Sequence, residues 1–221
     1  MIRVLVVDDQ RLVRAGLRML CDSAPDIEVL GEAEDGHQAT RLATELRPDV
    51  VLMDLRMPGM DGTAATRRVL ADRPATRVVV LTTFDDDQHL YPALAAGACG
   101  FLAKDVGPGE LLEGIRLAAG GGHPFSPKVL RRVVERALQA GDHENLGPRA
   151  SAAIGTATFT RRERDVLALL GAGLSNGQIA TRLNIGVTTV KTHITTLMTK
   201  TGSRNRVRLA VLAARHGLLP E

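Results

Sequence analysis

Val50-Val51-Leu52-Met53-Asp54-Leu55-Arg56-Met57-Pro58-Gly59 is the stretch that decides the fold, because four apolar residues run directly into a carboxylate and a Pro-Gly turn follows. An apolar run without alternation is typical of a strand buried on both faces, and such strands belong to parallel sheets that helices cover. Ligands of open parallel sheets bind just beyond the carboxyl ends of the strands. Asp54 is therefore expected at the functional edge of a sheet, although an Asp that only caps the next turn would follow a strand in the same way.

The alternation of a short apolar run with an amphipathic helix recurs along the first half of the chain. Expected strands cover residues 2–7, 27–30, 50–53, 77–82 and 99–103, and a helical period follows each of them. This alternation predicts an α/β fold with a parallel sheet and right-handed crossovers. In the flavodoxin-like strand order 2-1-3-4-5, the first and third strands are neighbours.

Polar side chains follow four of these strands at the point where each strand ends. They are Asp8 and Asp9 after the first strand, Asp54 after the third, Thr82 after the fourth and Lys104 after the fifth. Carboxylates on neighbouring strands would lie close together and repel unless a cation neutralises them. An all-oxygen cluster favours a hard ion that retains water ligands, so the sequence predicts an Mg²⁺ site. A lysine and a hydroxyl beside it could hold the oxygens of a phosphoryl group on Asp54.

These residues resemble the receiver domain of bacterial two-component response regulators. The resemblance covers roughly residues 1–122 and depends on Asp8-Asp9, the 51–58 stretch, Leu81-Thr82 and Lys104. It implies that Asp54 takes a phosphoryl group from a histidine of a sensor kinase, and that Thr82 and Lys104 bind the phosphoryl oxygens.

The resemblance also implies a metal set and a switch. Asp9, Asp54 and the backbone carbonyl of Arg56 would bind Mg²⁺, with Asp8 assisting through water. Phe101 stands three residues before Lys104, where receivers carry an aromatic switch residue, so it is expected to move when Thr82 moves towards the phosphoryl group.

Charge divides the chain into unlike parts. Residues 1–122 carry a net charge of −6, residues 123–158 carry +2 and residues 159–221 carry +7. An acidic first half and a basic last module suggest separate tasks, the second at a polyanion such as DNA. Residues 123–158 are expected to be a linker with one short helix that begins at Pro127, and the Gly- and Ala-rich part after Gly141 predicts flexibility.

The C-terminal module, residues 159–221, has the pattern of a small all-α helix-turn-helix domain. Two short helices joined by a tight turn at residues 184–186 are expected, and the second is polar on its outer face. Leu174-Ser175-Asn176-x-x-Ile179-Ala180 and Thr189-Val190-Lys191-x-His193 resemble the LuxR-type DNA-binding domain. A receiver followed by this module is the layout of NarL/FixJ-family transcriptional regulators.

The helix over residues 187–200 is the expected recognition helix for the major groove of double-stranded DNA. Base and phosphate contacts are expected from hydroxyl and basic side chains on it and just after it. These candidates are Thr188, Thr189, Lys191, Thr192, Thr195, Arg204 and Arg206.

Three residues depart from the family pattern. Gln178 stands where Glu is common, Gly186 stands where a Ser usually caps the recognition helix, and Thr201 occupies an inward position where Leu is common. The helix cap at Gly186 and the packing around Thr201 are therefore expected to be weaker.

The resemblance implies a transcription factor that is switched by phosphorylation, forms a homodimer on two half-sites and has RNA polymerase as a further candidate partner. One alternative is a DNA-binding regulator that does not use phosphorylation. Another is a phosphatase with an Asp nucleophile, but such enzymes place a second Asp two residues later, where this chain has Arg56.

A cytoplasmic location without membrane contact is expected. No apolar run reaches the roughly 20 residues that a membrane span requires. The two cysteines, Cys21 and Cys99, lie in apolar surroundings that are typical of free thiols.

Overall fold

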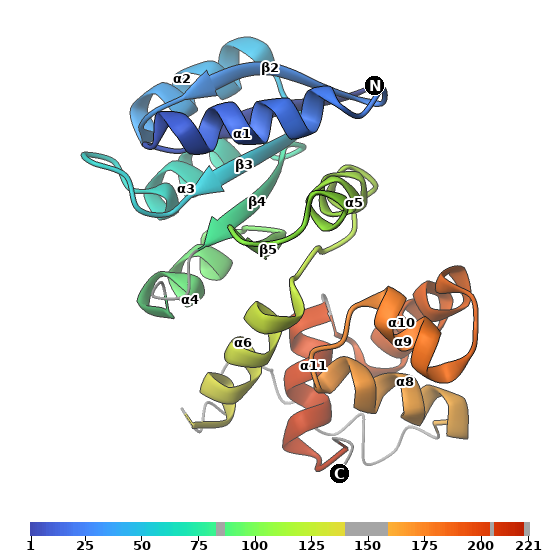
Figure 1. Ribbon diagram of the computed structural model, residues 1–221. Coiled ribbons are helices and arrows are strands. Elements are labelled where there is room, and N and C mark those ends of the chain that lie inside the picture. Colours follow the sequence, from blue (N-terminus) through green and yellow to red (C-terminus); the bar gives the residue numbers. More distant parts are fainter. Residues whose placement is uncertain (83–86, 140–158, 204–205, 219–221) are drawn as a thin grey trace. The chain divides into compact units, whose positions relative to one another are not determined.

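The computed structural model describes residues 1–82, 87–139, 159–203 and 206–218, and the chain divides into two compact units (Figure 1). The first unit is Met1–Phe125 and the second is Ser126–Glu221. The division thus lies three residues beyond the boundary at residue 122 that the sequence suggested. The residues expected to form a flexible linker after Gly141 lie outside the described part of the chain, as does Arg204.

The first unit has the expected α/β architecture, with a five-stranded parallel sheet in the order β2-β1-β3-β4-β5. This confirms the predicted flavodoxin-like fold. Its elements are β1 (Ile2–Val7), α1 (Arg11–Asp22), β2 (Ile27–Ala33), α2 (Gly36–Leu46), β3 (Val50–Asp54), α3 (Gly62–Asp72), β4 (Arg77–Thr82), α4 (Asp87–Ala95), β5 (Gly100–Ala103) and α5 (Pro108–Ala119).

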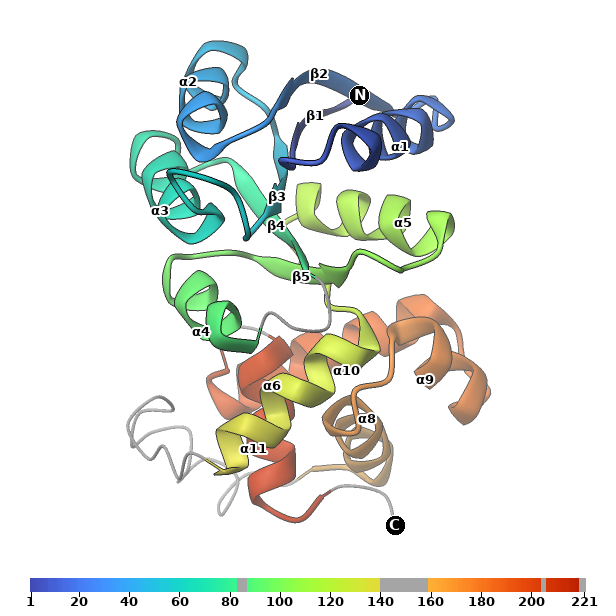
Figure 2. The ribbon, with the colours of Figure 1, turned by 60° about the vertical axis from the view of Figure 1, so that its left-hand side comes forward.

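Helices cover both faces of the sheet, as Figure 2 shows. Successive side chains of a strand point to opposite faces, so Val4 and Val6 of β1 pack in one apolar core and Leu5 and Val7 in the other. The first core includes residues of α1 and α5, and the second includes residues of α2 and α3. Every residue of β3 is buried, which is the reason for its uninterrupted apolar run.

The register of the sheet aligns the strand ends that carry polar residues. Val7 at the end of β1 is opposite Met53, and Asp54 at the end of β3 is opposite Leu81. Thr82 at the end of β4 is in turn opposite Ala103. The residues that follow these strands therefore emerge at one edge of the sheet.

The start of α3 holds the backbone of Asp54 in place. The side chain of Asp61 caps this helix by accepting a hydrogen bond from the Ala64 N–H at 2.7 Å. The Gly62 N–H donates to the Leu55 carbonyl at 3.0 Å. A Cβ atom added at Gly62 would lie 1.9 Å from the Asp54 carbonyl oxygen, so only glycine allows this close approach.

The second unit is helical in its described part. Its elements are α6 (Pro127–Gln139), α8 (Arg161–Gly171), α9 (Asn176–Leu183), α10 (Val187–Thr201) and α11 (Arg206–Arg215). The helix expected within the linker is α6, and it packs against α11 through a buried apolar face. That face consists of Val129, Leu130, Val133 and Val134. This helix therefore belongs to the C-terminal unit and is not a free part of the linker.

The helix caps follow the sequence closely. Thr160 with Glu163 and Ser175 with Gln178 form reciprocal capping boxes at the starts of α8 and α9, so Gln178 retains the function of the usual Glu. Gly186 at the start of α10 has no side chain to cap the helix, as expected. Thr201 is fully buried, and its hydroxyl donates to the Leu197 carbonyl at 2.7 Å, so this inward position is polar but hydrogen-bonded.

We predict that Gly62→Ala destabilises the first unit by about 1–3 kcal/mol, because the new methyl group must push the Asp54 backbone aside. Thermal unfolding followed by circular dichroism would measure the effect. Gly16→Ala is the matched control, since a Cβ atom there meets nothing within 4 Å in the exposed side of α1. That change should stabilise the helix by about 0.5–1 kcal/mol. Equal melting temperatures for the two variants would contradict the close approach at Gly62.

Candidate functional site

Three carboxylates converge at the edge of the sheet. Asp8 and Asp9 follow β1, Asp54 ends β3, and one oxygen of each lies within 4.8 Å of the others. Asp8 and Asp54 are buried, whereas Asp9 is exposed. The cluster predicted from the strand ends is therefore present, with one carboxylate open to solvent.

Lys104 joins two of these carboxylates. Its ammonium nitrogen lies 2.7 Å from Asp8 Oδ2 and 2.9 Å from Asp54 Oδ2. The backbone N–H of Lys104 donates to the Thr82 carbonyl at 2.8 Å, which anchors the residue just beyond β5. The lysine side chain thus reaches back across β4 to β1 and β3, and it places a positive charge between two buried negative ones.

Burial and neighbouring charges shift the pKa values of Asp54 and Lys104. Burial raises the pKa of Asp54, and the charge of Asp8 acts in the same direction, although Lys104 and the Arg56 backbone N–H favour the ionised form. Burial alone would lower the pKa of Lys104, but its contacts with Asp8 and Asp54 raise it above the usual value. These contacts therefore favour the charged form of Lys104, whereas burial disfavours the charged form of Asp54.

The donor set fits Mg²⁺. All three side chains offer carboxylate oxygens, and the open position of Asp9 leaves room for water ligands. Two hydrogen bonds fix the position of Asp8. Its Oδ1 accepts the Gln10 N–H at 2.9 Å, and its backbone carbonyl accepts from the Arg14 guanidinium at 2.6 Å. The Arg56 carbonyl stays a prediction as a ligand, with the Arg56 backbone adjacent to Asp54.

The predicted switch residues are both buried at the neighbouring strands. Thr82 is 3% exposed at the end of β4, and Phe101 in β5 is fully buried. The Phe101 ring stacks on Phe125 with a centroid distance of 5.7 Å and an interplanar angle of 23°. The Phe101 N–H also donates to the Pro124 carbonyl at 2.8 Å, so residues 124–125 run beside β5 as a short bridge.

Phe125 was missed in the sequence. Its only signal is an aromatic residue next to a proline, at the exit from the first unit. Gly100 permits the approach, because a Cβ atom there would lie 2.4 Å from the Pro124 carbonyl oxygen. Phe101, the predicted switch residue, is therefore in direct contact with the segment that leads into α6.

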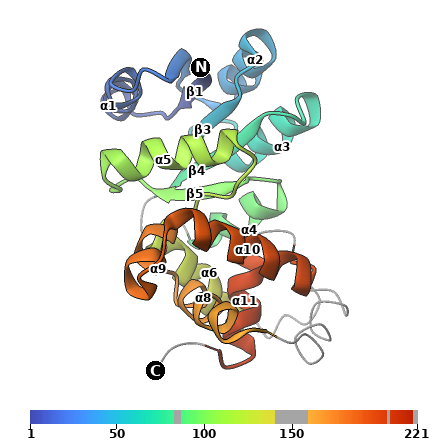
Figure 3. The same cartoon turned by 90° about the vertical axis from the view of Figure 1, so that its right-hand side faces the viewer.

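The helix that the sequence predicts as the recognition helix is α10 of the second unit (Figure 3). Val190, Ile194 and Leu197 are buried against the other helices of this unit. The five predicted DNA-contacting residues of this helix are all exposed: Thr188, Thr189, Lys191, Thr192 and Thr195.

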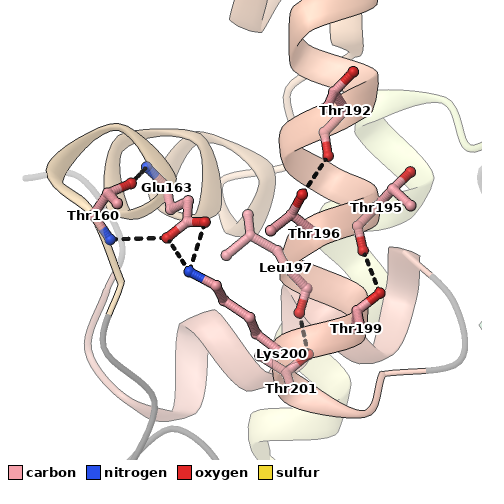
Figure 4. A network of polar contacts seen from close by, with 9 residues as sticks. All are labelled: Thr160, Glu163, Thr192, Thr195, Thr196, Leu197, Thr199, Lys200 and Thr201. Atoms are coloured by element: carbon pink, nitrogen blue, oxygen red, sulfur yellow. Dashed lines mark hydrogen bonds and ion pairs between the residues drawn. The ribbon is translucent and has the colours of Figure 1, made fainter.

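An ion pair ties α10 to α8 (Figure 4). Lys200 lies 2.8 Å from both carboxylate oxygens of Glu163, which is 5% exposed. The Lys200 ammonium lowers the pKa of Glu163, with help from the Thr160 backbone N–H. The sequence identified Glu163 only as a helix cap, because its partner lies 37 residues away.

The structure contradicts the prediction that Arg206 contacts DNA. Its side chain is 7% exposed, and its guanidinium donates to Asn176 Oδ1 at 2.7 Å and to the Leu174 carbonyl. Burial lowers the pKa of this arginine to about 10. The guanidinium therefore joins the start of α11 to the turn before α9 and is not presented to a phosphate.

Comparisons with known proteins match both units. Residues 4–116 match the family described as the response regulator receiver domain, and residues 157–213 match the bacterial regulatory proteins of the luxR family. The transcriptional regulatory protein LiaR of Bacillus subtilis is 42% identical over 219 residues, which cover 99% of this chain and all of LiaR. The response regulator protein VraR of Staphylococcus aureus is 34% identical over 218 residues, 99% of each chain.

Solved structures give the same result. The crystal structure of the response regulator ChrA from a heme-sensing two-component system is 35% identical, has a TM-score of 0.54, and covers 99% of this chain and 98% of its own. A LuxR-family two-component response regulator from Aurantimonas is 34% identical with a TM-score of 0.58, and the alignment covers 62% of this chain and 97% of that one.

We predict that Mg²⁺ stabilises the first unit. At about ten times the dissociation constant the gain is about 1.4 kcal/mol, or roughly 5–10 °C in melting temperature for a domain of this size. Asp9→Asn and Asp54→Asn should abolish the Mg²⁺ effect, whereas Asp72→Asn, an exposed change outside the cluster, should retain it. An equal Mg²⁺ response in all variants would place the ion elsewhere.

Without metal, the raised pKa of Asp54 sets a pH dependence. A raised carboxyl pKa contributes stability that is present below the unfolded pKa and is lost as the pH rises through the folded pKa. Asp54→Asn should therefore melt at a higher temperature than the wild type near pH 7, and this difference should shrink towards roughly pH 4. A difference that grows on acidification would contradict the sign of the shift.

We predict that Arg206→Ala destabilises the second unit by about 2–3 kcal/mol, because it leaves the Leu174 carbonyl and Asn176 without their partner. Hydrogen exchange of the amides in α8 to α11 would measure the loss. The control Arg164→Ala, at an exposed position of α8, should stay within about 0.5 kcal/mol. Unchanged exchange together with a weaker salt dependence of DNA binding would instead assign Arg206 to a phosphate.

Proposed function

This chain belongs to the NarL/LuxR-family response regulators, which join a receiver domain to a LuxR-type DNA-binding domain, and we propose that a phosphoryl group on Asp54 controls its binding to double-stranded DNA. The observation that carries the proposal is the Lys104 bridge between Asp8 and Asp54, beside an exposed Asp9. A site of this kind combines a nucleophilic carboxylate, a cation for the incoming charge and oxygen ligands for a metal.

Phosphoryl transfer follows from these positions. A carboxylate oxygen of Asp54 attacks the phosphorus of a phosphohistidine on a sensor kinase and the P–N bond breaks. The electron pair of that bond stays on the ring nitrogen, and the histidine leaves as neutral imidazole because its other ring nitrogen already carries a proton. Lys104 is already 2.9 Å from Asp54 and neutralises charge on the phosphoryl oxygens. Thr82 supplies a hydroxyl from the next strand. Mg²⁺, held by Asp8, Asp9, Asp54 and the Arg56 carbonyl, would neutralise further negative charge when bound.

The signal leaves the receiver through Phe101. Movement of Thr82 towards the phosphoryl group frees space beside β4, and Phe101 repacks into it. Phe101 stacks on Phe125 and bonds to the Pro124 carbonyl, so its repacking alters the segment directly before α6. Because residues 124–125 continue along the chain into α6, and α6 packs on α11, the change reaches the DNA-binding unit through the backbone that joins the two units.

The basic second unit then binds DNA. Residues 159–221 carry a net charge of +7, and the exposed face of α10 enters the major groove. A homodimer that forms on phosphorylation would contact two half-sites with matching symmetry. The other expected partner is RNA polymerase, and the expected location is the cytoplasm. No described helix combines the length and apolar character that crossing a bilayer requires.

The phosphatase alternative lacks its general acid. Arg56 stands two residues after Asp54, and its side chain is exposed. Hydrolysis of a chromogenic phosphate ester that Asp54→Asn abolishes would favour this alternative. The regulator that does not use phosphorylation would be favoured if Asp54→Asn left signalling intact.

We predict that activation raises affinity for selected DNA by about tenfold or more. Genomic fragments would be selected with the full chain, with and without beryllofluoride and Mg²⁺, since beryllofluoride replaces the phosphoryl group on an aspartate. The wild type should capture paired half-sites when activated, and Asp54→Asn should not respond. Identical capture by the wild type in both states would show that the receiver does not control DNA binding.

The same DNA selection tests whether the signal passes through the stacked rings of Phe101 and Phe125. Phe125→Ala removes the ring that covers Phe101 but touches none of the carboxylates. This variant should still bind beryllofluoride with Mg²⁺, while its DNA affinity becomes the same in both states. A wild-type DNA response from Phe125→Ala would exclude the stack as the route.

A further inference from the structure

The exposed face of α10 carries a row of threonines. Thr188, Thr192, Thr195 and Thr199 are spaced four, three and four residues apart, which places them on one side of the helix over about 16 Å. All four are exposed. We call these four residues the threonine stripe, and Figure 4 shows three of them.

Three of the four threonines in the stripe already use their hydroxyl protons within the helix. Thr192 donates to the Thr188 carbonyl, Thr195 to the Lys191 carbonyl and Thr199 to the Thr195 carbonyl, each at 3.1 Å. A threonine hydroxyl has a single proton to donate. Thr192, Thr195 and Thr199 therefore present their γ-methyl groups and oxygen lone pairs to a ligand, because their hydroxyl protons are already bonded.

Apart from its lysines and the half-buried His193, α10 has no other side chains that commonly read bases by hydrogen bonding. The sequence of this helix contains no Arg, Asn, Gln, Asp or Glu. Of its two lysines, Lys200 is bound by both oxygens of Glu163. Most of the exposed face of α10 is thus a surface of methyl groups with Lys191 beside it.

We infer that the threonine stripe recognises the C5-methyl groups of pyrimidines in the major groove, chiefly those of thymine, and that Thr192 and Thr195 determine this preference. The inference rests on the proposed DNA-binding function and specifies what that function reads. A C5-methyl group is the apolar feature that the major groove offers, and threonine methyl groups pack on it. Thr192 and Thr195 are the members with bonded hydroxyls that lie one residue and one turn after Lys191, in the middle of the helix.

The same chemistry occurs in 5-methylcytosine, so the DNA probes must separate the two bases. The test uses the activated full chain and a duplex enriched from random-sequence DNA. In one set, each thymine of the half-site is replaced by deoxyuridine, which removes the methyl group and retains the pairing edge. In a second set, a thymine whose replacement by deoxyuridine weakens binding is replaced by cytosine or by 5-methylcytosine, each paired with guanine. We expect about fourfold weaker binding for each lost contact with a methyl group. The 5-methylcytosine duplex should bind more tightly than the cytosine duplex, but less tightly than the thymine duplex.

Protein variants separate the methyl group from the hydroxyl. Thr195→Val and Thr192→Val retain a methyl group at the same branch and remove the hydroxyl, whereas Thr195→Ser and Thr192→Ser do the reverse. The valine variants should bind within about twofold of the wild type, and the serine variants should bind the thymine duplex about fourfold more weakly. The serine variants should no longer distinguish thymine from deoxyuridine at the contacted position, as a double-mutant cycle would show.

Thr196→Ser is the matched control. Thr196 has the same hydroxyl bond to the carbonyl four residues before it, at 3.0 Å, but is half-buried and off the stripe. It should retain full discrimination between thymine and deoxyuridine. Circular dichroism would compare the helix content and melting temperature of each variant. Each dissociation constant would be calculated from the concentration of folded protein.

The possible outcomes distinguish the inference about methyl-group recognition from the DNA-binding function on which it rests. Loss of binding in the valine variants with retention in the serine variants would overturn the inference and assign the reading to the hydroxyls. Equal binding to thymine and deoxyuridine duplexes would also overturn it, while leaving the DNA-binding function in place. Failure to enrich any duplex would overturn both.

Discussion

The ammonium group of Lys104 is the interaction on which the rest of the receiver depends. It lies between Asp8 and Asp54, two buried carboxylates that would otherwise repel each other at the edge of the sheet. Three strands must be in register for this contact, because Asp8 follows β1, Asp54 ends β3 and Lys104 follows β5. Burial raises the pKa of Asp54, with a further contribution from the charge of Asp8, and the site therefore gains stability when a further cation binds.

The DNA-binding unit is stabilised by polar contacts that join distant parts of its sequence. Glu163 binds Lys200 and so joins α8 to the end of α10. Arg206 joins α11 to the turn before α9, and α6 closes over α11 from the N-terminal side of the unit. These contacts are made on the inner side of the unit, and the outward-facing threonines of α10 remain exposed.

Much of the fold and the site could be predicted from local pattern. The buried run of β3, the carboxylates after two strands and the capping motifs each depend on a few adjacent residues, and each was confirmed in place. Arg206 was predicted wrongly for a physical reason. A basic residue after a recognition helix has the same sequence appearance whether it faces phosphate or folds inwards, and only the packing of α11 on α8 buries it.

By itself the sequence determined the positions of the strands, the identity of the carboxylate cluster and the helix-turn-helix, because these follow from hydrophobic period and from residues at strand and helix ends. The strand order was expected from the flavodoxin-like pattern of alternating strands and helices, and the sheet confirms it. Only the tertiary structure decided that Phe125 stacks on Phe101, that Lys200 is bound to Glu163 and that α6 belongs to the second unit. Each of these joins residues more than 20 positions apart, where side-chain packing selects the partner and no local periodicity records it.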